Sequence, residues 1–331
     1  MIKKKSFLIL LLFLLGIAAG CAWAAPSADT PKQLTLLAGS PGSNWTTMGS
    51  AISSVWAKEV LPTNCLMGGA VSNLTDIKNG KGDIGITYVP FLESMRRGNT
   101  DRSSSKTDDV VVMTNLFEQY ICFIARKDFV ERNRIFLLSD LFDKKLPVRM
   151  ATLKPGTGVE SVLRSLLKEC YNVTYDSIKS AGGRVEYTSY EAGMEMLVEG
   201  HVDIFVLVLG KNVAALRQLD GLVDYEILQI DNSSLRSLAR DYGTTTAVLN
   251  PSMHAGISIP IRTVGLPICL AVRKSLPDDI VYELCKTLWQ YKGEIELVAK
   301  DVEELSPETA LPETVAAHPG AVKFWNEHKE K

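Results

Sequence analysis

Hydrophobic positions along this chain alternate between short apolar runs and longer stretches in which apolar residues recur at helical spacing. Short apolar runs predict strands, and spacings of three and four residues predict helices that bury one face. The predicted strands cover 34–38, 66–67, 83–87, 110–126, 148–151, 184–187, 203–209, 227–230 and 264–272. The predicted helices cover 43–58, 72–80, 89–97, 159–170, 191–199, 235–240, 277–299 and 319–331.

Strands that alternate with helices are typical of an α/β protein in which mainly parallel sheets are covered by helices. Two predicted strands, 110–126 and 264–272, are long enough to leave one group of elements and enter another. They predict two lobes joined by a two-strand hinge near residues 120–126 and 245–265. Lobe I is expected to contain residues 25–122 and 250–331, and lobe II residues 123–249.

Two predicted strands run directly into a helix through a turn rich in glycine and hydroxyl residues, at 34–45 and at 148–158. At such a junction the free backbone N–H groups and the positive end of the helix dipole meet. Ligands of open α/β sheets bind beyond the carboxyl ends of the strands. The two junctions therefore predict two half-sites that close on one small anionic ligand.

The candidate ligand-binding residues come from these junctions and from neighbouring strand ends. They are Gly42, Ser43, Asn44, Trp45, Ser72, Asn73, Tyr88, Gly156, Thr157 and Gly158. The polar groups are expected to hold the two ends of the ligand, while Trp45 and Tyr88 line the cleft and exclude water. Each role has a structural alternative. Ser43 and Thr157 can be N-caps, Asn73 can cap its own helix, and Trp45 can be buried against the sheet.

Two further expectations concern this site. Lys154 and Arg184 are the candidates for a cation that pairs with the ligand, with a solvated surface side chain as the alternative for Lys154. If Asn73 binds the ligand, Asn73→Ala is expected to weaken binding and to leave the melting temperature nearly unchanged.

The first 24 residues have the pattern of a secretory signal peptide. Lys3–Lys5 form a positive region, an apolar region follows over 7–19, and Ala22–Ala24 supplies a small-x-small cleavage pattern. The pattern predicts export to the periplasm, with a mature chain that begins at Ala25. Lipid attachment at Cys21 is the alternative. No later segment approaches about 20 apolar residues, so no other membrane span is expected.

Composition narrows the class of protein. A net charge of −2 with no basic tract argues against nucleic-acid binding. The four histidines have no metal-ligand spacing, and no Gly-x-Ser-x-Gly nucleophile elbow occurs. The chain is therefore expected to be no enzyme and to hold no metal and no cofactor. Of the six cysteines, Cys122 and Cys269 are the candidates for a disulfide, with two reduced, buried thiols as the alternative.

Eight segments resemble, in order and spelling, the motifs of a receptor family. They are 42–49, 69–74, 79–86, 155–158, 197–203, 263–265, 276–282 and 318–321. The chain resembles the solute-binding receptors of the TRAP-associated extracytoplasmic immunogenic (TAXI) type. Each motif alone is weak, but eight in order are fairly specific.

The resemblance implies a type II-like periplasmic binding protein fold and a monomeric receptor without a cofactor. Its implied ligand is a small organic anion such as glutamate, 2-oxoglutarate or another dicarboxylate, captured between the lobes. Its implied partners are the membrane permease subunits of a TRAP transporter, a secondary transporter driven by an ion gradient. The alternatives are a periplasmic sensor subunit and the binding protein of an ATP-driven importer.

Overall fold

The structure, a computed structural model, describes residues 31–39, 43–98, 106–211 and 214–329. Apart from Pro31 they belong to one unit, Lys32–Lys331. The strands are β1 (Leu34–Leu37), β2 (Thr63–Leu66), β3 (Ile84–Tyr88), β4 (Val110–Arg126), β5 (Arg149–Leu153), β6 (Arg184–Thr188), β7 (Ile204–Gly210), β8 (Tyr225–Ile227), β9 (Thr245–Leu249) and β10 (Ile261–Arg273). The predicted signal peptide, Cys21 and Gly42 lie outside the described residues.

The helices alternate with these strands. They are α2 (Asn44–Glu59), α3 (Ala70–Lys78), α4 (Val89–Arg97), α5 (Lys127–Asn133), α6 (Ser139–Asp143), α7 (Gly158–Tyr171), α8 (Tyr175–Ser180), α9 (Tyr190–Val198), α10 (Asn232–Tyr242), α11 (Asp278–Gln290), α12 (Lys292–Glu296) and α13 (Pro319–His328), with 3₁₀ turns η1 (Ala214–Gln218) and η2 (Lys300–Glu304). The predicted α/β class is confirmed.

The described strands form one sheet in the order β2-β1-β3-β10-β4-β7-β5-β6, with β8 beside β4 and β9 beside β10. Two groups in it share one plan, β2-β1-β3 and β6-β5-β7, and the pairs inside each group are parallel. The third strand of each group pairs antiparallel with a long crossing strand, β3 with β10 and β7 with β4. We call these groups with their helices the first and the second lobe. The two-lobed architecture is confirmed, although the crossing strands themselves are antiparallel.

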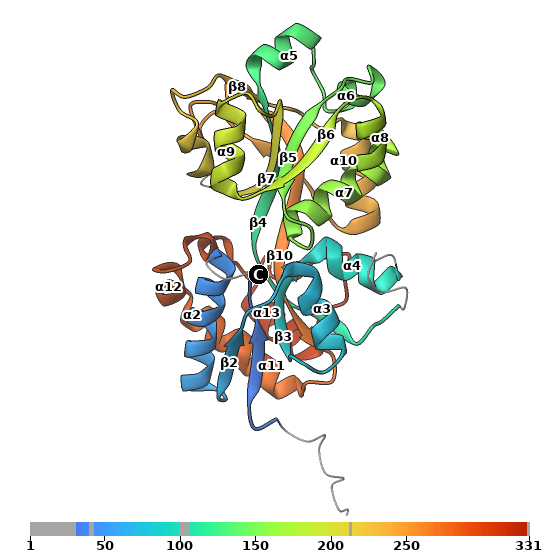
Figure 1. The fold of residues 1–331 in the computed structure, drawn as a ribbon. Coiled ribbons are helices and arrows are strands. Elements are labelled where there is room, and N and C mark those ends of the chain that lie inside the picture. The colour runs from blue at the N-terminus through green and yellow to red at the C-terminus, as the bar shows by residue number, and fades with distance from the viewer. Residues whose placement is uncertain (1–30, 40–42, 99–105, 212–213, 330–331) are drawn as a thin grey trace, which may run out of the picture. The chain divides into compact units, whose positions relative to one another are not determined.

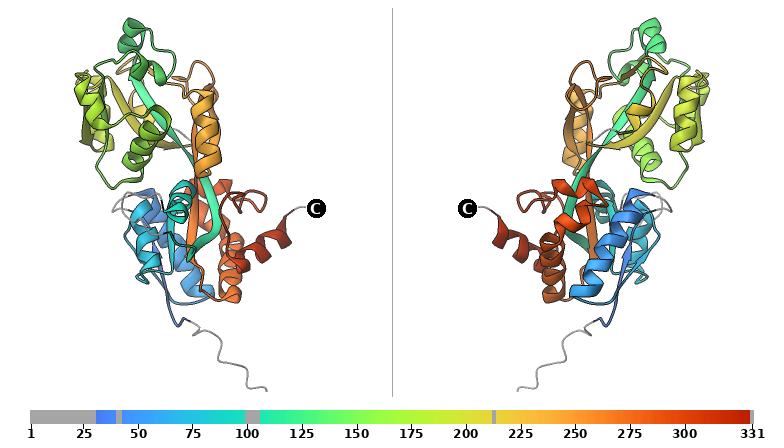
Figure 2. Two further views of the ribbon diagram at one scale, coloured as in Figure 1. Left: turned by 90° about the vertical axis from the view of Figure 1, so that its right-hand side faces the viewer. Right: turned by 90° about the vertical axis from the view of Figure 1, so that its left-hand side faces the viewer.

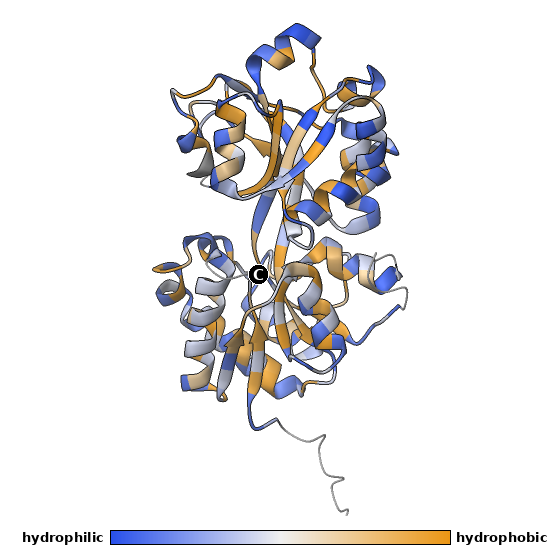
Figure 3. Cartoon of the chain, in the orientation of Figure 1, coloured by the Kyte–Doolittle hydropathy of each residue, from blue (hydrophilic) through white to orange (hydrophobic). Residues whose placement is uncertain are grey.

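The crossing strand β4 changes partner along its length (Figure 1). Residues 110–120 pair with β10, and residues 119–125 pair with β7. Both ends of β4 are buried, but Glu118, Gln119 and Tyr120 at the change of partner are only partly buried. Figure 3 shows this linking stretch as hydrophilic between apolar ends. The predicted strand 110–126 is therefore confirmed, and the exact lobe boundaries at 122/123 and 249/250 stay a prediction.

The C-terminal helices return to the first lobe, where Figure 2 shows α11 and α13 on one side of the sheet and α3 and α4 on the other. Two fully buried indoles hold this arrangement. The Nε1 atom of Trp56 in α2 donates to the carbonyl oxygen of Leu284 in α11 at 3.0 Å. The Nε1 atom of Trp325 in α13 donates to the carbonyl oxygen of Met113 in β4 at 3.3 Å. Each ring buries a large apolar area without leaving its N–H unpaired.

The two lobes repeat the same hydrogen bonds around an aspartate that precedes the third strand. Asp83 directly precedes β3, and Asp203 directly precedes β7. In the first lobe, Oδ2 of Asp83 accepts from the N–H of Thr35 at 2.8 Å, and its carbonyl oxygen accepts from the N–H of Arg273 at 2.9 Å. In the second lobe, Oδ2 of Asp203 accepts from the N–H of Arg149 at 2.9 Å, and its carbonyl oxygen accepts from the N–H of Arg126 at 2.9 Å. Each aspartate therefore ties the first strand and the crossing strand of its lobe to the third strand.

The prediction of one helix over 277–299 is wrong, because α11 ends at Gln290 and the short helix α12 follows. Between them Tyr291 has φ −100° and ψ 12°, outside the helical range. Its hydroxyl donates to Glu59 Oε1 of α2 at 2.7 Å. This tertiary contact, which no local periodicity reveals, accompanies the break.

The exposed Gly293 in α12 offers a test of whether the second helix needs a glycine. A Cβ built there meets no atom within 4 Å, and its φ is not left-handed. We expect Gly293→Ala to raise the free energy of unfolding by about 0.5–1 kcal/mol, because alanine loses less backbone entropy than glycine in a helix. Urea denaturation measures the change. A less stable variant would show that α12 depends on glycine.

Candidate ligand-binding site

The carboxyl ends of β1 and β5 lead into α2 and α7, the two junctions that the sequence singles out. Ser43 caps α2, and its Oγ accepts from the N–H of Thr46 at 3.3 Å. Thr157 caps α7, and its Oγ1 accepts from the N–H of Glu160 at 3.3 Å and donates to the carbonyl oxygen of Lys154 at 2.8 Å. The N-cap role of both hydroxyls is confirmed. The first turn of α2 carries no acidic residue, so no local carboxylate offsets its dipole.

Tyr88, the last residue of β3, lies where these helix starts meet. Its ring centroid is 5.1 Å from that of Trp45 in the first turn of α2. A Cβ on Gly158, the first residue of α7, would lie 2.6 Å from Cε2 of Tyr88 and 3.5 Å from the Cβ of Ala70 in α3. The starts of α2 and α3 in the first lobe and of α7 in the second lobe therefore approach one tyrosine ring.

The hydroxyl of Tyr88 connects this ring to the crossing strand. Tyr88 is only 4% exposed, and its hydroxyl donates to Oε1 of Gln119 in β4 at 2.8 Å. Burial, and secondarily the neighbouring Tyr190, raises the pKa of Tyr88 well above its usual value, so the hydroxyl stays protonated and remains a donor. Phe91 packs edge-on against the ring, with centroids 5.5 Å apart.

Sequence reasoning missed Gln119. The available signal is a pair of neighbouring polar residues, Glu118 and Gln119, in the middle of a predicted strand that is mostly apolar.

Two glycines allow the turns to take their shape. Gly156 has φ +92°, a left-handed conformation that side chains rarely adopt. A Cβ on Gly68, in the turn before α3, would lie 1.9 Å from Oδ1 of Asn73. The turn before α7 and the turn before α3 therefore both require glycine, for different reasons.

The structure gives Asn73 a structural role. The residue is 0% exposed. Its Nδ2 donates to the carbonyl oxygens of Leu37 at 3.0 Å, Ala38 at 2.8 Å and Ile86 at 2.8 Å, and its Oδ1 accepts from the N–H of Gly69 at 3.0 Å. The side chain joins the ends of β1 and β3 to the start of α3. It has no polar atom left for a ligand, so we do not include it among the proposed contacts.

The remaining candidates lie at the edges of the site. The Oγ of Ser72 donates to the carbonyl oxygen of Gly69 at 3.1 Å, a local bond within the first turn of α3. Asn44, the first residue of α2, is exposed. Gly42 lies outside the described residues.

Of the two predicted cations, one is in the wrong place. Arg184 begins β6, where its Nη2 donates to the carbonyl oxygen of His201 at 2.8 Å and its Nε pairs with Glu186. This is the amino end of a parallel strand, opposite to the end from which the helix starts project. Lys154 follows β5 directly and is exposed, so it stays a candidate.

Cys122 and Cys269 are free, buried thiols, so the predicted alternative of reduced cysteines is confirmed. Cys122 lies opposite Leu207 of β7 in the second lobe, whereas Cys269 lies opposite Thr87 of β3 in the first lobe.

In the part of the chain that the structure describes, no three His, Cys, Asp or Glu side chains are grouped to hold a metal ion. No helix there combines the length and the apolar character needed to cross a bilayer.

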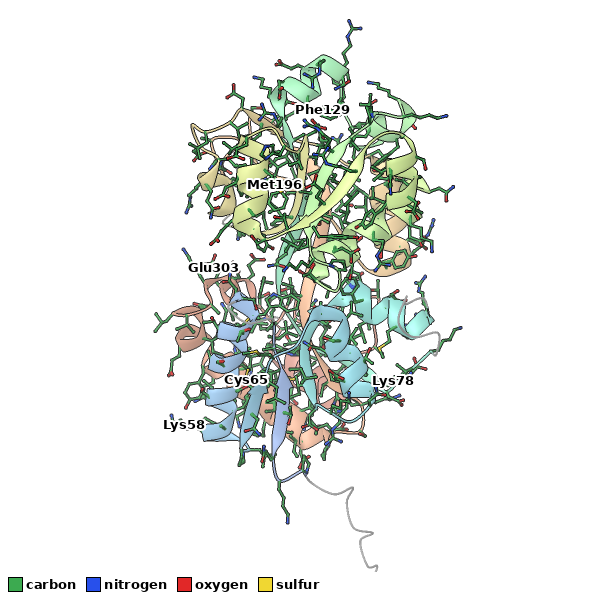
Figure 4. The ribbon with its side chains drawn as sticks, viewed as in Figure 1. Lys58, Cys65, Lys78, Phe129, Met196 and Glu303 are labelled. Carbon is green, nitrogen blue, oxygen red and sulfur yellow. The ribbon has the colours of Figure 1, made fainter. Side chains whose placement is uncertain are left out.

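Half-buried carboxylates gather beside the linking stretch of β4. Oε1 of Glu118 accepts from the hydroxyl of Thr245, and the Glu118 N–H donates to Oε2 of Glu304 at 3.2 Å. Burial raises the pKa of Glu118, Glu304 and Asp301 above the ordinary range. Asp301 and Glu304 come from η2, on which Figure 4 labels Glu303 near the level where β4 passes between the lobes.

Removing one of these charges should stabilise the protein at neutral pH. A raised pKa in the folded state means that folding favours the protonated form, so stability is lost as the pH rises through that pKa. Asp301 and Glu118 raise the pKa of Glu304 further, while the Glu118 N–H and Lys211 oppose the rise. We expect Glu304→Gln to raise the melting temperature by about 1–3 °C at pH 7 and to change it little at pH 4. Thermal unfolding at both pH values measures this, and a lower melting temperature at pH 7 would contradict it.

Solved structures share this architecture at low sequence identity. XAC2383 from Xanthomonas citri bound to chloride ion matches with a TM-score of 0.52 and 12% identity, over 90% of this chain and 96% of that chain. MatC from Rhodopseudomonas palustris with bound malate matches with a TM-score of 0.49 and 16% identity, over 90% and 97%. The periplasmic binding protein BugD matches with a TM-score of 0.48 and 13% identity, over 91% and 94%.

At these identities the likeness concerns the fold alone. The match to XAC2383 and the strand order together support a two-lobed α/β fold. The sequence itself matches the profile of the NMT1-like family over residues 36–328, from β1 through α13. This chain therefore belongs to the NMT1-like family.

Proposed function

We propose that this protein is an extracytoplasmic solute-binding receptor that captures a small organic anion between its lobes. One observation carries the proposal. Gly158 at the start of α7 packs on the ring of Tyr88, which packs in turn against Trp45 at the start of α2. Two helix N-termini that are far apart in the sequence therefore approach one place from different lobes. Their N–H groups and dipoles favour a negatively charged guest there.

The proposed contacts follow from this geometry. The start of α2, with Ser43 and Asn44, holds one carboxylate, and the turn Gly156–Gly158 holds the other end of the ligand. Tyr88 and Trp45 form an aromatic wall that excludes water and strengthens these hydrogen bonds. Gly42 and Ser72 complete the first half-site.

The proposed ligand class is that of glutamate, 2-oxoglutarate and similar dicarboxylates. Capture involves closure of the lobes about β4 and β10, the two strands that connect them. The receptor is proposed to work as a monomer. It has no catalytic role in this proposal, since the site offers donors and an aromatic wall rather than an acid–base pair.

Thermal-shift screening tests the binding proposal. Amino acids, dicarboxylates and keto acids are added to the mature chain one at a time. A ligand that binds only the folded state stabilises it by about 2.7 kcal/mol at a concentration of 100 times its Kd. At least one small acid is therefore expected to raise the melting temperature by several degrees. Stabilisation by neutral or cationic solutes alone would contradict the proposal.

We further propose delivery to the permease subunits of a TRAP-type secondary transporter. The support is the ordered set of eight TAXI-like motifs together with the signal-peptide pattern. The test is solute uptake into vesicles that contain the permease subunits of a TRAP transporter. An imposed ion gradient without ATP is expected to drive uptake in the presence of this receptor. A requirement for ATP would contradict a TRAP partner and favour an ATP-driven importer.

A further inference from the structure

Gln119 occupies a special position on the crossing strand. It pairs with Leu266 of β10 and with Gly210 of β7, so it lies where β4 passes from the first lobe to the second. Its side chain contacts Tyr88, the ring that the starts of α2 and α7 approach. Gln119 therefore lies between the two half-sites proposed to hold the ends of the ligand.

Among the residues that the structure describes, only the oxygen of the Gln119 amide has a hydrogen-bond partner. Oε1 accepts the Tyr88 hydroxyl, which burial keeps protonated. Within the described ranges Nε2 makes no hydrogen bond and is not fully buried, so solvent reaches it. Because Oε1 and Nε2 belong to one planar group, the bond to Tyr88 also orients the two amide N–H donors.

The surroundings of Gln119 favour a neutral partner for these donors. Glu118 and Tyr120 point to the opposite face of β4, since successive side chains of a strand alternate. Gly210, the partner of Gln119 in β7, lies close to a carboxylate, since Oδ1 of Asp301 would be 3.2 Å from a Cβ at that glycine. A second carboxylate brought beside Asp301 would be repelled, whereas a keto or hydroxyl oxygen would not.

We propose that Gln119 determines specificity by donating an amide N–H to a keto or hydroxyl oxygen that the ligand carries between its two ends. This inference rests on the proposed function and narrows its ligand class to oxygen-substituted acids. A ligand without that oxygen leaves the donor unpaired when the lobes close over it, and an unpaired polar group in a closed site costs affinity.

The test compares 2-oxoglutarate with glutarate, which has the same two carboxylates and lacks the keto oxygen. Isothermal titration calorimetry measures both Kd values for the wild type and for Gln119→Met, which removes the donors without adding charge. The wild type is expected to bind 2-oxoglutarate at least tenfold more tightly than glutarate. In Gln119→Met the affinity for 2-oxoglutarate is expected to fall to the level of glutarate, with glutarate binding little changed.

Tyr88→Phe is the matched control, because it breaks the same Tyr88–Gln119 bond from the other side and leaves the amide donors in place. It is expected to retain a preference for 2-oxoglutarate. If Gln119→Met and Tyr88→Phe weaken both probes equally, Gln119 only supports Tyr88 and the inference is overturned. Equal binding of both probes by the wild type also overturns it.

Two other outcomes separate this inference from the proposed function. L-glutamate serves as a third probe, with an ammonium group in place of the keto oxygen. If L-glutamate binds more tightly than 2-oxoglutarate and Gln119→Met leaves its affinity unchanged, the receptor function stands and the inference fails. If no small acid, including these three, binds the wild type, the proposed function and the inference both fail.

Discussion

Asn73→Asp is expected to lower the free energy of unfolding at pH 7 by about 4 kcal/mol, because it replaces a buried amide donor with a carboxylate. Three carbonyl oxygens, those of Leu37, Ala38 and Ile86, lie within 3.0 Å of Nδ2 of Asn73. An ionised carboxylate in that place would be repelled by all three. Its pKa would be raised, so stability would be greatest at low pH and lost as the pH rises through that pKa. Urea denaturation at pH 4 and pH 7 measures this difference.

The neighbouring Ser72→Ala is the control for Asn73→Asp. Ser72 makes one local hydrogen bond, to the carbonyl oxygen of Gly69. Its replacement by alanine is expected to lower the free energy of unfolding by less than about 1 kcal/mol. This expectation for Asn73 replaces the one drawn from the sequence, in which loss of its side chain leaves melting nearly unchanged. An Asn73→Asp variant as stable as the wild type would show that the three carbonyl groups find other donors.

Gly158→Val is expected to reduce the affinity for 2-oxoglutarate at least tenfold while changing the melting temperature by less than about 3 °C. The added side chain would meet the ring of Tyr88, since even its Cβ would lie 2.6 Å from Cε2. The start of α7 would then be pushed away from the start of α2, and the two half-sites could not hold one ligand together. The helix itself should tolerate the change, because valine has a higher helix propensity than glycine.

The control is the same substitution at Gly293, where a Cβ meets no atom within 4 Å. Gly293→Val is expected to leave the affinity unchanged. Calorimetry gives the Kd values and differential scanning fluorimetry the melting temperatures. Unaltered binding in Gly158→Val would contradict the proposed site, whereas a large loss of stability would show that the contact with Tyr88 holds the lobes together without any ligand.

Elements with a strong pattern could be predicted from the sequence. The helix Val89–Arg97 and the strand Val110–Arg126 agree with the prediction at both ends. Short elements could not be predicted, because a segment of only a few residues shows no clear periodicity of apolar positions. The missed elements are α5, α6, α8, β9 and the 3₁₀ turns η1 and η2. The predicted strand 227–230 is another example, since β8 ends at Ile227.

The candidate site shows the same division between local and tertiary information. The N-caps Ser43 and Thr157 follow from local sequence, because a hydroxyl before an amphipathic stretch caps a helix. The role of Asn73 depends on strand ends more than thirty residues away in the chain, at Leu37 and Ala38. The bond between Tyr88 and Gln119 likewise joins two strands, so no local pattern reveals it.

The sheet order has a consequence for self-association. The main strand order of the sheet begins with β2 and ends with β6, so each of these strands has a neighbour on one side only. An end strand offers free backbone groups to a second chain, and charged side chains oppose such aggregation. β6 carries Arg184 and Glu186, whereas β2, Thr63–Leu66, has no charge and leaves Leu66 49% exposed. Of these two end strands, β2 is therefore the less protected against the addition of a foreign strand.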